Sequence, residues 1–245
     1  MEAVYTRPKG ITENAVSGFC PGCLHSTVHK LVVEVLEELG LMEKTVRVAG
    51  IGCCGLGSAY QNMDFICAPH GRACAVATGL KRSNPDTFVY TYQGDGDLAA
   101  IGLAETISAA ARGENFSVIF TNNSTYGMTG GQLAPTTLIG MEATTAPHGR
   151  TAEEHGYPLH VIEMLDTLKA PAYLTRVTCN SPQNVRKTRA AIKKAFAYQL
   201  EGKGFSLVEI LTNCTTNWHM SPLESLKFIE TTTSREYPLG EIRAR

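Results

Sequence analysis

Two short polar segments of the sequence could together bind a hard cation and a diphosphate. Gly94-Asp95-Gly96 follows one β-branched and aromatic segment, and Asn123 follows the next apolar segment. In a parallel sheet both positions lie at the carboxyl ends of strands, where α/β proteins bind ligands. Carboxylate and amide oxygens suit Mg²⁺, and glycines let the backbone approach a phosphate. A lone Gly-Asp-Gly more often forms only a turn, but the two segments together favour a Mg²⁺ site that carries the diphosphate of a nucleotide or of thiamine diphosphate.

The eight cysteines indicate a second kind of chemistry. Cys20 and Cys23 form a C-x2-C pair, Cys53 and Cys54 are adjacent in a glycine-rich segment, and the others are scattered at Cys67, Cys74, Cys179 and Cys214. The N-terminal residues contain no signal-peptide core, so we expect a cytoplasmic chain with reduced thiols. The spacing then favours metal or redox chemistry over disulfides. We expect Cys67, Cys74 and Cys179 to be buried free thiols.

Three further side chains could contact an anion. His70 opens an expected helix, where its imidazole could reach a phosphate oxygen or a substrate carboxylate, although a capping or packing role is almost as common. Arg72 and Arg150 are candidates for anion contacts, with solvated surface positions as the alternative. The sequence contains no pattern that distinguishes His25 or His29 from ordinary surface histidines.

An α/β scaffold is needed to position these residues. Strand-like segments alternate with helix-like segments, which is the pattern of a mostly parallel sheet with helices on both faces. Strands are predicted over 46–51, 87–92, 116–120, 172–179 and 205–211, and helices over 26–39, 71–81, 98–111, 161–168 and 182–200. The segment 135–157 is rich in Thr, Pro and Gly without periodicity, and we expect it to be a long ordered loop over the site.

Composition and charge exclude several classes of function. The chain has 245 residues, with 22 Lys+Arg against 23 Asp+Glu and a formal net charge of -1, so no basic surface is expected to bind nucleic acid or an anionic membrane. No apolar run approaches the roughly 20 residues of a membrane span. We expect a single domain over 1–245, in which 221–245 is a C-terminal extension. One or two amphipathic turns and then a polar tail, lying on a partner or loose, are predicted for this extension.

Five motifs, in the same order along the chain, resemble the β subunit of 2-oxoacid:ferredoxin oxidoreductases, a family of thiamine diphosphate enzymes. They are Cys20-Pro21-Gly22-Cys23, Gly50-Ile51-Gly52-Cys53, His70-Gly71-Arg72, Gly94-Asp95-Gly96, and the segment from Asn122-Asn123 through Gly127-Met128-Thr129 to Gln132. The resemblance covers about residues 18–220. It implies the thiamine-diphosphate-binding fold of the diphosphate type.

The resemblance also implies roles for individual residues. Mg²⁺ is expected on the Asp95 carboxylate, the Asn123 side-chain oxygen and the main-chain carbonyl of Thr125. Residues expected against the cofactor are Cys53, Gly94, Gly96, Asp97, Gly127, Met128 and Thr129, of which Asp97 and Thr129 are the expected side-chain hydrogen-bonders. His70 is the candidate catalytic residue.

A [4Fe–4S] cluster is a further implication of the resemblance. Its expected ligands are the cysteines at the family's positions, namely Cys20, Cys23, Cys53 and Cys214, with 1–25 as the cluster-binding N-terminal segment. Cys54 stands where the family usually has a small residue, so it remains an alternative to Cys53 as the third ligand. Structural zinc is the rival metal, because a C-x2-C pair suits tetrahedral Zn²⁺ equally well.

The implied reaction is the oxidative decarboxylation of a 2-oxoacid with coenzyme A, in which electrons pass through the cluster to ferredoxin. No segment of this sequence resembles the pyrimidine-binding domain of such enzymes. The resemblance therefore implies an α subunit that carries this domain, and a ferredoxin-like subunit or ferredoxin as electron acceptor. The run from Met128 to Gly131 resembles the 2-oxoglutarate and 2-oxoisovalerate types. The alternative function is a non-catalytic electron-transfer or scaffold subunit with a structural metal.

Overall fold

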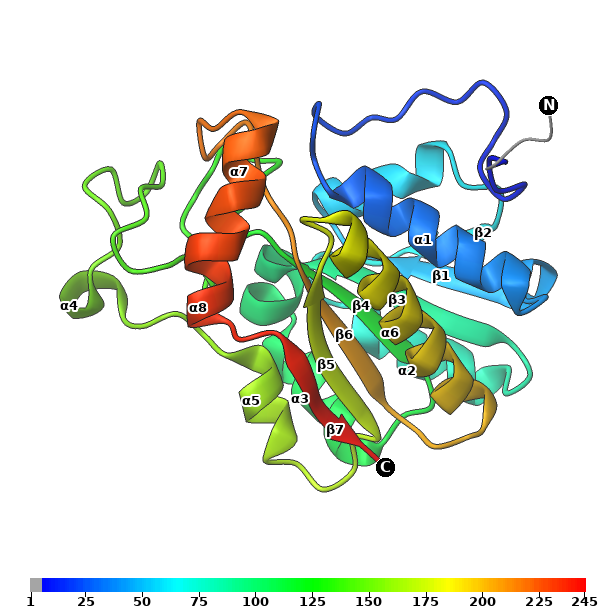
Figure 1. Ribbon diagram of the computed structural model, residues 1–245. Coiled ribbons are helices and arrows are strands. Elements are labelled where there is room, and N and C mark those ends of the chain that lie inside the picture. Colours follow the sequence, from blue (N-terminus) through cyan, green and yellow to red (C-terminus); the bar gives the residue numbers. More distant parts are fainter. Residues whose placement is uncertain (1–5) are drawn as a thin grey trace.

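A seven-stranded sheet forms the centre of the computed structural model, which describes residues 6–245 (Figure 1). The strand order is β2-β1-β3-β4-β6-β5-β7, and the first six strands are parallel. β7 pairs antiparallel with β5 at one edge. The strands are β1 (Thr45–Ala49), β2 (Asp64–Cys67), β3 (Phe88–Gly94), β4 (Ser117–Asn122), β5 (Tyr173–Thr178), β6 (Ser206–Leu211) and β7 (Gly240–Ala244). The predicted α/β class is confirmed.

Helices cover both faces of the sheet, as predicted. One apolar layer joins α1 (His25–Glu38) and α6 (Pro182–Leu200) to sheet residues such as Tyr90 and Val208. The other joins α2 (Ala73–Ser83), α3 (Leu103–Arg112) and α5 (Val161–Asp166) to residues such as Val89. Because Val89 and Tyr90 are adjacent on β3, they point to opposite faces. A strand that contributes to two apolar layers must be apolar throughout, and this explains the unbroken apolar runs in the sequence.

Two local predictions about helices need correction. The helix predicted over 26–39 begins at His25, so Ser26 lies inside its first turn, where its hydroxyl donates to the carbonyl oxygen of Cys23. The helix predicted over 98–111 begins instead as a π-helix, η3 (Gly96–Ile101), and continues as α3. The helix predicted over 182–200 is confirmed as α6, and Ser181 caps it, since its hydroxyl accepts a hydrogen bond from the amide of Asn184.

The polar C-terminal extension is folded against the sheet, which corrects the expectation of a loose or partner-bound tail. It contains α7 (Pro222–Phe228), the π-helix η4 (Ile229–Thr233), α8 (Ser234–Glu236) and β7 (Figure 1, orange to red). A capping box between Ser221 and Glu224 starts α7. β7 then covers the β5 edge of the sheet, and an edge strand can be mostly polar because it is exposed.

Three further short elements were not predicted. Every position of β2, at the other edge of the sheet, is exposed, including the apolar Phe65 and Ile66. A 3-10 helix, η1 (Met42–Lys44), precedes β1, and a second one, η2 (Cys53–Ala59), follows it.

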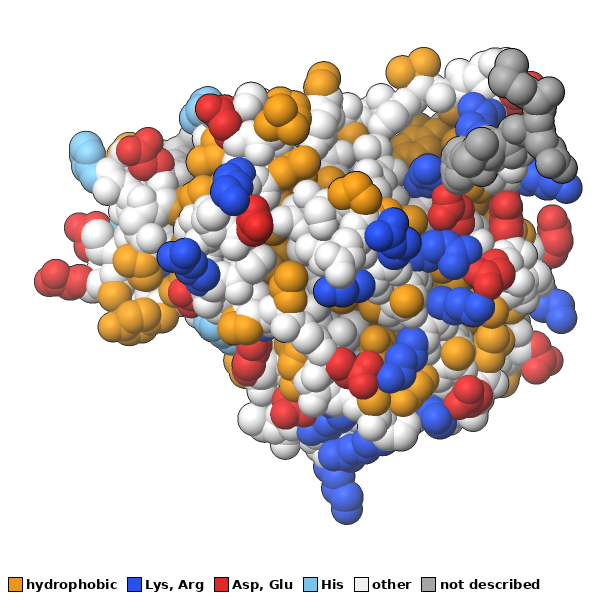
Figure 2. All heavy atoms as spheres, viewed as in Figure 1, with side chains coloured by type: hydrophobic (Ala, Val, Ile, Leu, Met, Phe, Trp, Pro, Cys, Tyr) orange, Lys and Arg blue, Asp and Glu red, His pale blue; other side chains and the backbone are white. Residues whose placement is uncertain are grey.

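The surface carries both signs of charge. On the face in Figure 2, acidic and basic side chains are interspersed, and Arg189 and Lys193 of α6 both pair with Glu38 of α1. Within residues 6–245, no helix combines the length and the apolar character needed to cross a membrane.

Candidate functional site

A pocket opens at the carboxyl ends of β1, β3 and β4, where parallel sheets bind ligands. Its lining contains every residue that the sequence assigns to the cofactor, together with His70. These residues are Cys53, Gly94, Asp95, Gly96, Asp97, Asn123, Thr125, Gly127, Met128 and Thr129. His25, Ile51 and Tyr126 also line the pocket, and the sequence analysis did not assign them to it.

Asp95 is a buried carboxylate in this pocket. Its Oδ1 accepts a hydrogen bond of 2.9 Å from the amide of Gly96, and its Oδ2 accepts one of 2.6 Å from the hydroxyl of Thr136. Burial raises the pKa of Asp95 to about 6, although these hydrogen bonds oppose the shift. The hydrogen bonds to its carboxylate come from neutral groups, so this buried charge suits a bound cation.

The loop after β4 supplies the other predicted Mg²⁺ ligands. Asn123 Oδ1 accepts a hydrogen bond of 3.3 Å from the amide of Thr125, which closes an Asx turn over Ser124. Ser124 adopts a φ of 57°, a strained value for a residue other than glycine. The indole Nε1 of Trp218 donates to the carbonyl oxygen of Asn123 at 3.1 Å. With Asp95, this loop offers a set of oxygen ligands that fits Mg²⁺.

Asp97 does not act as expected of a side chain that hydrogen-bonds the diphosphate. Its Oδ1 accepts hydrogen bonds from His70 Nδ1 at 2.7 Å and from the amides of Gly71 and Ile51 at 2.8 and 3.2 Å. Its Oδ2 accepts one from Gln93 Nε2 at 2.7 Å. A carboxylate has no proton to donate to a phosphate, so Asp97 instead joins the segments that surround the pocket.

His70 is held by this contact. Because the Asp97 carboxylate can only accept, Nδ1 carries the hydrogen of this contact, and Nε2 is the ring nitrogen that Asp97 does not engage. The side chain is 36% exposed and lines the pocket. This position suits a group that forms a hydrogen bond with a ligand in the pocket, and the catalytic role of His70 stays a prediction.

The diphosphate loop is closely packed. Tyr126 lies over Gly96, where any Cβ would collide with its ring, and its hydroxyl donates to the Gly96 carbonyl oxygen at 3.2 Å. Thr129 donates its hydroxyl to Gln132 Oε1 at 2.5 Å, and Met128 is half exposed at the rim. The glycine at position 96 therefore makes room for Tyr126, while Thr129 is within the lining but is bonded to its own loop.

Gly127 joins the cofactor loop to two of the predicted cluster ligands. A Cβ at Gly127 would lie 3.5 Å from the Sγ of Cys53 and 3.6 Å from the Sγ of Cys214. Burial, together with the nearby thiols of Cys214, Cys53 and Cys20, raises the pKa of Cys23 to about 12. The four thiols predicted as ligands are thus neighbours in space.

The segment with Cys20 and Cys23, which we name the cysteine hook (residues 20–23), is fixed by residues near the other end of the chain. Gly22 has a φ of 77° and lies against Pro222, where a Cβ would be only 2.5 Å away from the ring. Asn213, just before Cys214, donates to the Gly22 carbonyl oxygen at 3.0 Å and accepts from the amide of Leu24 at 2.9 Å. These contacts place the hook beside Cys214.

The geometry favours Cys53 over Cys54 as the third ligand. Cys54 is fully buried and donates its thiol hydrogen to the Ile51 carbonyl oxygen at 3.3 Å, and burial raises its pKa. Of the remaining cysteines, Cys74 and Cys179 are buried as expected, whereas Cys67 is exposed on β2, which corrects the expectation of burial.

The cysteine spacing can be compared with the two candidate metals. Among residues 6–245, no three His, Cys, Asp or Glu side chains surround a point close enough to hold one metal ion. Four thiolates on one Zn²⁺ must approach to about 2.3 Å from it, whereas the irons of a [4Fe–4S] cluster separate their four thiolates. Metal analysis of the protein therefore decides between zinc and a cluster on these thiols.

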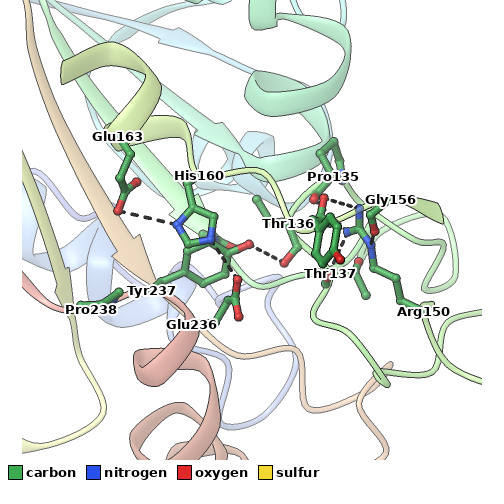
Figure 3. Close-up of polar contacts among 12 residues, drawn as sticks. Pro135, Thr136, Thr137, Arg150, Gly156, His160, Glu163, Glu236, Tyr237 and Pro238 are labelled. Carbon is green, nitrogen blue, oxygen red and sulfur yellow. Dashed lines mark hydrogen bonds and ion pairs between the residues drawn. The ribbon is translucent and has the colours of Figure 1, made fainter. Parts of the chain in front are cut away.

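The two arginines proposed as anion contacts have other roles. Arg150 is buried and donates to the carbonyl oxygens of six residues, among them Thr137 at 2.7 Å and Pro135 and Gly156 at 2.9 Å; Figure 3 shows its guanidinium within this loop. Arg72 pairs with Glu105 of α3. Arg150 thus orders the long loop over 135–157, whose order was predicted, and its donors are not directed at an anion.

Several residues of the site have no signal in the sequence. Trp218, Thr136 and Asn213 lie outside the motifs, and their roles depend on contacts with residues far away in the chain. His25 follows the hook closely, and its Nδ1 lies 3.0 Å from the hydroxyl of Tyr92. A buried tryptophan usually finds an acceptor for its N–H, but the sequence does not indicate which one.

Comparison with known proteins identifies the class. The family described as "Thiamine pyrophosphate enzyme, C-terminal TPP binding domain" matches residues 50–210. This match and the fold define a domain of the thiamine-diphosphate-binding class. Among solved structures, the chain is similar to the 2-oxoglutarate:ferredoxin oxidoreductase from Magnetococcus marinus with 2-oxoglutarate, coenzyme A and succinyl-CoA bound. The TM-score is 0.76 and the identity 27%, over 92% of this chain and 72% of that chain.

Curated relatives specify the family further. The chain is 44% identical over 237 residues to ketoisovalerate oxidoreductase subunit VorA of Methanothermobacter thermautotrophicus, covering 97% of this chain and 50% of that protein. It is 35% identical over 219 residues to 2-oxoglutarate synthase subunit KorB of Archaeoglobus fulgidus, covering 89% of this chain and 78% of that protein. The chain belongs to the β-type subunits of the 2-oxoacid:ferredoxin oxidoreductases, so the resemblance drawn from the five motifs is confirmed. It spans about half the length of the VorA relatives.

Proposed function

We propose that the chain binds Mg²⁺-thiamine diphosphate and a proximal [4Fe–4S] cluster, and that it acts in the coenzyme A-dependent oxidative decarboxylation of a 2-oxoacid with ferredoxin as electron acceptor. The observation that carries the proposal is the position of Gly127. This residue belongs to the predicted diphosphate loop and lies against both Cys53 and Cys214. A cofactor on this loop and a cluster on these cysteines would therefore be direct neighbours, as electron transfer between them requires.

The residues of the pocket have separate tasks in this proposal. Asp95, Asn123 and the carbonyl of Thr125 would hold Mg²⁺, and the glycines of the loop would let the diphosphate approach the backbone. Thiamine diphosphate, when bound, supplies the nucleophilic carbon that attacks the oxoacid. Asp97 fixes the ring of His70 through Nδ1, which leaves Nε2 to form a hydrogen bond with the ligand.

The substrate is proposed from the relatives. VorA is named for ketoisovalerate and KorB for 2-oxoglutarate. We therefore propose a branched-chain 2-oxoacid or 2-oxoglutarate as substrate, and the greater identity to VorA favours the branched-chain acid.

The partners are proposed from the relatives, which are named as subunits. The described residues form one sheet with its helices, which fits the diphosphate half of a thiamine site. An α subunit with the pyrimidine-binding domain would complete the site, and a ferredoxin-like subunit or ferredoxin would accept the electrons. We place the complex in the cytoplasm, where thiols remain reduced.

Metal and cofactor analysis of anaerobically purified protein tests the proposal. We expect about four irons and four sulfides per chain, a visible and electron paramagnetic resonance (EPR) signature of a [4Fe–4S] cluster, and bound thiamine diphosphate. Coexpression with the candidate α subunit should then produce oxoacid- and coenzyme A-dependent dye reduction. Zinc in place of iron, without thiamine diphosphate, would instead support the alternative of a scaffold or electron-transfer subunit with a structural metal.

A further inference from the structure

The C-terminal extension is connected to the predicted Mg²⁺ ligand by two hydrogen bonds in series. Tyr237, between α8 and β7, is fully buried, and its hydroxyl donates to the carbonyl oxygen of Thr136 at 2.8 Å. Thr136, also fully buried, donates its own hydroxyl to Asp95 Oδ2 at 2.6 Å. Figure 3 shows the Tyr237 hydroxyl directed at Thr136. A residue of the last strand region thus supports a residue that contacts Asp95.

Tyr237 is itself firmly placed. Its ring lies 4.9 Å from that of His160, and the guanidinium of Arg176 lies 5.3 Å from its centroid. His160 pairs through Nε2 with Glu236 at 2.9 Å and through Nδ1 with Glu163 at 3.7 Å (Figure 3). These contacts join α8 to α5 and the sheet, so the tyrosine hydroxyl has a defined position.

The hydroxyl of Thr136 has a specific effect on Asp95. Hydrogen bonds to Oδ2 from Thr136 and to Oδ1 from Gly96 fix the plane of the carboxylate. Each oxygen can accept a further interaction, and Asp95 lines the pocket. A carboxylate that is held in this way does not lose side-chain freedom when it binds a cation.

We propose that Thr136 and Tyr237 are positioning residues for the Mg²⁺-diphosphate site, and that the C-terminal extension sets the affinity of this site by holding Asp95 through them. The inference rests on the proposed binding of Mg²⁺-thiamine diphosphate. It assigns a role in cofactor binding to a segment outside the family match at residues 50–210.

The test uses the full chain in complex with the candidate α subunit, freed of cofactor, and measures the dissociation constant for thiamine diphosphate with Mn²⁺ as an EPR-visible substitute for Mg²⁺. Thr136→Val removes the hydroxyl that donates to the carboxylate and should weaken binding about tenfold, the cost of losing a hydrogen bond to a charged group. Thr136→Ser should rescue most of the affinity. Tyr237→Phe should weaken binding by a smaller factor, and it should add nothing to Thr136→Val if it acts through Thr136.

Two controls keep the outcomes separate. Tyr198→Phe removes a hydroxyl from a buried ring of α6 and should leave the dissociation constant unchanged. Asp95→Asn should abolish binding if Asp95 is a ligand. Wild-type affinity in folded Thr136→Val and Tyr237→Phe, with binding lost in Asp95→Asn, would overturn the positioning role and leave the proposed function standing. Failure of the wild-type complex with the candidate α subunit to bind Mn²⁺-thiamine diphosphate would overturn the proposed function itself.

Discussion

The side-chain amide of Asn217 donates a hydrogen bond of 3.2 Å to the Sγ of Cys214. The same Nδ2 lies 2.8 Å from the carbonyl oxygen of Gly127. One amide therefore contacts both a predicted cluster ligand and the diphosphate loop. Gly131 packs closely against Asn217. Because Gly131 has no side chain and adopts a φ of 85°, it leaves room for Asn217 in this position.

We predict that Asn217→Leu lowers the midpoint potential of the cluster. A donor to a ligand sulfur stabilises the more negative, reduced state, and hydrogen bonds to sulfur are among the factors that set cluster potentials. The measurement is an EPR-monitored redox titration of protein with a full complement of iron. Asn184→Leu, on α6, removes an amide that donates to Asn180 and should not change the potential. A potential that is equal in Asn217→Leu and wild type would contradict the prediction.

The two aspartates of the site should respond oppositely to neutralisation. Asp95→Asn replaces a buried carboxylate whose hydrogen bonds come from neutral groups, so the cofactor-free protein should be at least as stable as wild type. Asp97→Asn places an amide nitrogen among four donors, and we expect it to cost about 1–3 kcal/mol. Urea unfolding of both cofactor-free variants measures this difference. Equal destabilisation by both changes would show that the two carboxylates do not have these separate roles.

Arg150 should be irreplaceable by lysine. Its guanidinium donates to six carbonyl oxygens, whereas a lysine ammonium has three donors and lacks the planar geometry. We expect Arg150→Lys to cost about 2–4 kcal/mol through unsatisfied buried carbonyls and to increase proteolysis within 135–157. The matched change Arg72→Lys, at a partly exposed ion pair with Glu105, should cost at most about 1 kcal/mol. Resistance of the loop to proteolysis in Arg150→Lys would refute the role that we assign to Arg150.

The pH dependence of stability should contain a contribution from His29. Burial, and then the neighbouring charges of Arg47 and His25, lower the pKa of His29 well below its usual value. The folded protein therefore keeps His29 neutral under conditions in which the unfolded chain is protonated. Because the unfolded state binds more protons below about pH 6.5, stability falls as the pH decreases there, by up to about 1.4 kcal/mol per pH unit.

Replacing His29 should remove this contribution. In urea unfolding between pH 5.5 and 7.5, we expect His29→Gln to show a smaller loss of stability toward acid than wild type. His148→Gln, at an exposed position, should keep the wild-type slope. If the slope is the same in all three proteins, His29 does not titrate on unfolding in this range.

The sequence predicts the parallel sheet and the pocket well because both depend on local patterns. The segments around Val89 and Val118 form buried central strands of the sheet. Buried parallel strands are unbroken apolar segments, and such segments are easily recognised in a sequence. Asp95 and Asn123 each follow the end of one of these strands. Predicting the parallel strands was therefore sufficient to place both residues at the same edge of the sheet.

The remaining features depend on contacts that no local pattern records. Asp97 directly follows the Gly94-Asp95-Gly96 motif, but its four donors come from segments after β1, before α2 and within β3. The partners of Arg150 cannot be recognised in the sequence, because they are backbone carbonyls, which every residue has. The polarity of β7 is typical of a loose tail, and only the unpaired edge of β5 makes it a strand.

The contacts of Asn213 with Gly22 and Leu24 determine when the site can assemble during synthesis. These partners are separated by 191 and 189 positions in the chain. β6, which precedes Asn213, is also the last parallel strand to be made, although it inserts between β4 and β5. Contacts between such distant segments form late in folding. The cysteine hook therefore leaves the ribosome early, but its contacts with Asn213 form only after nearly the whole chain has been made. A nascent or truncated chain consequently exposes the thiols of the hook without these contacts.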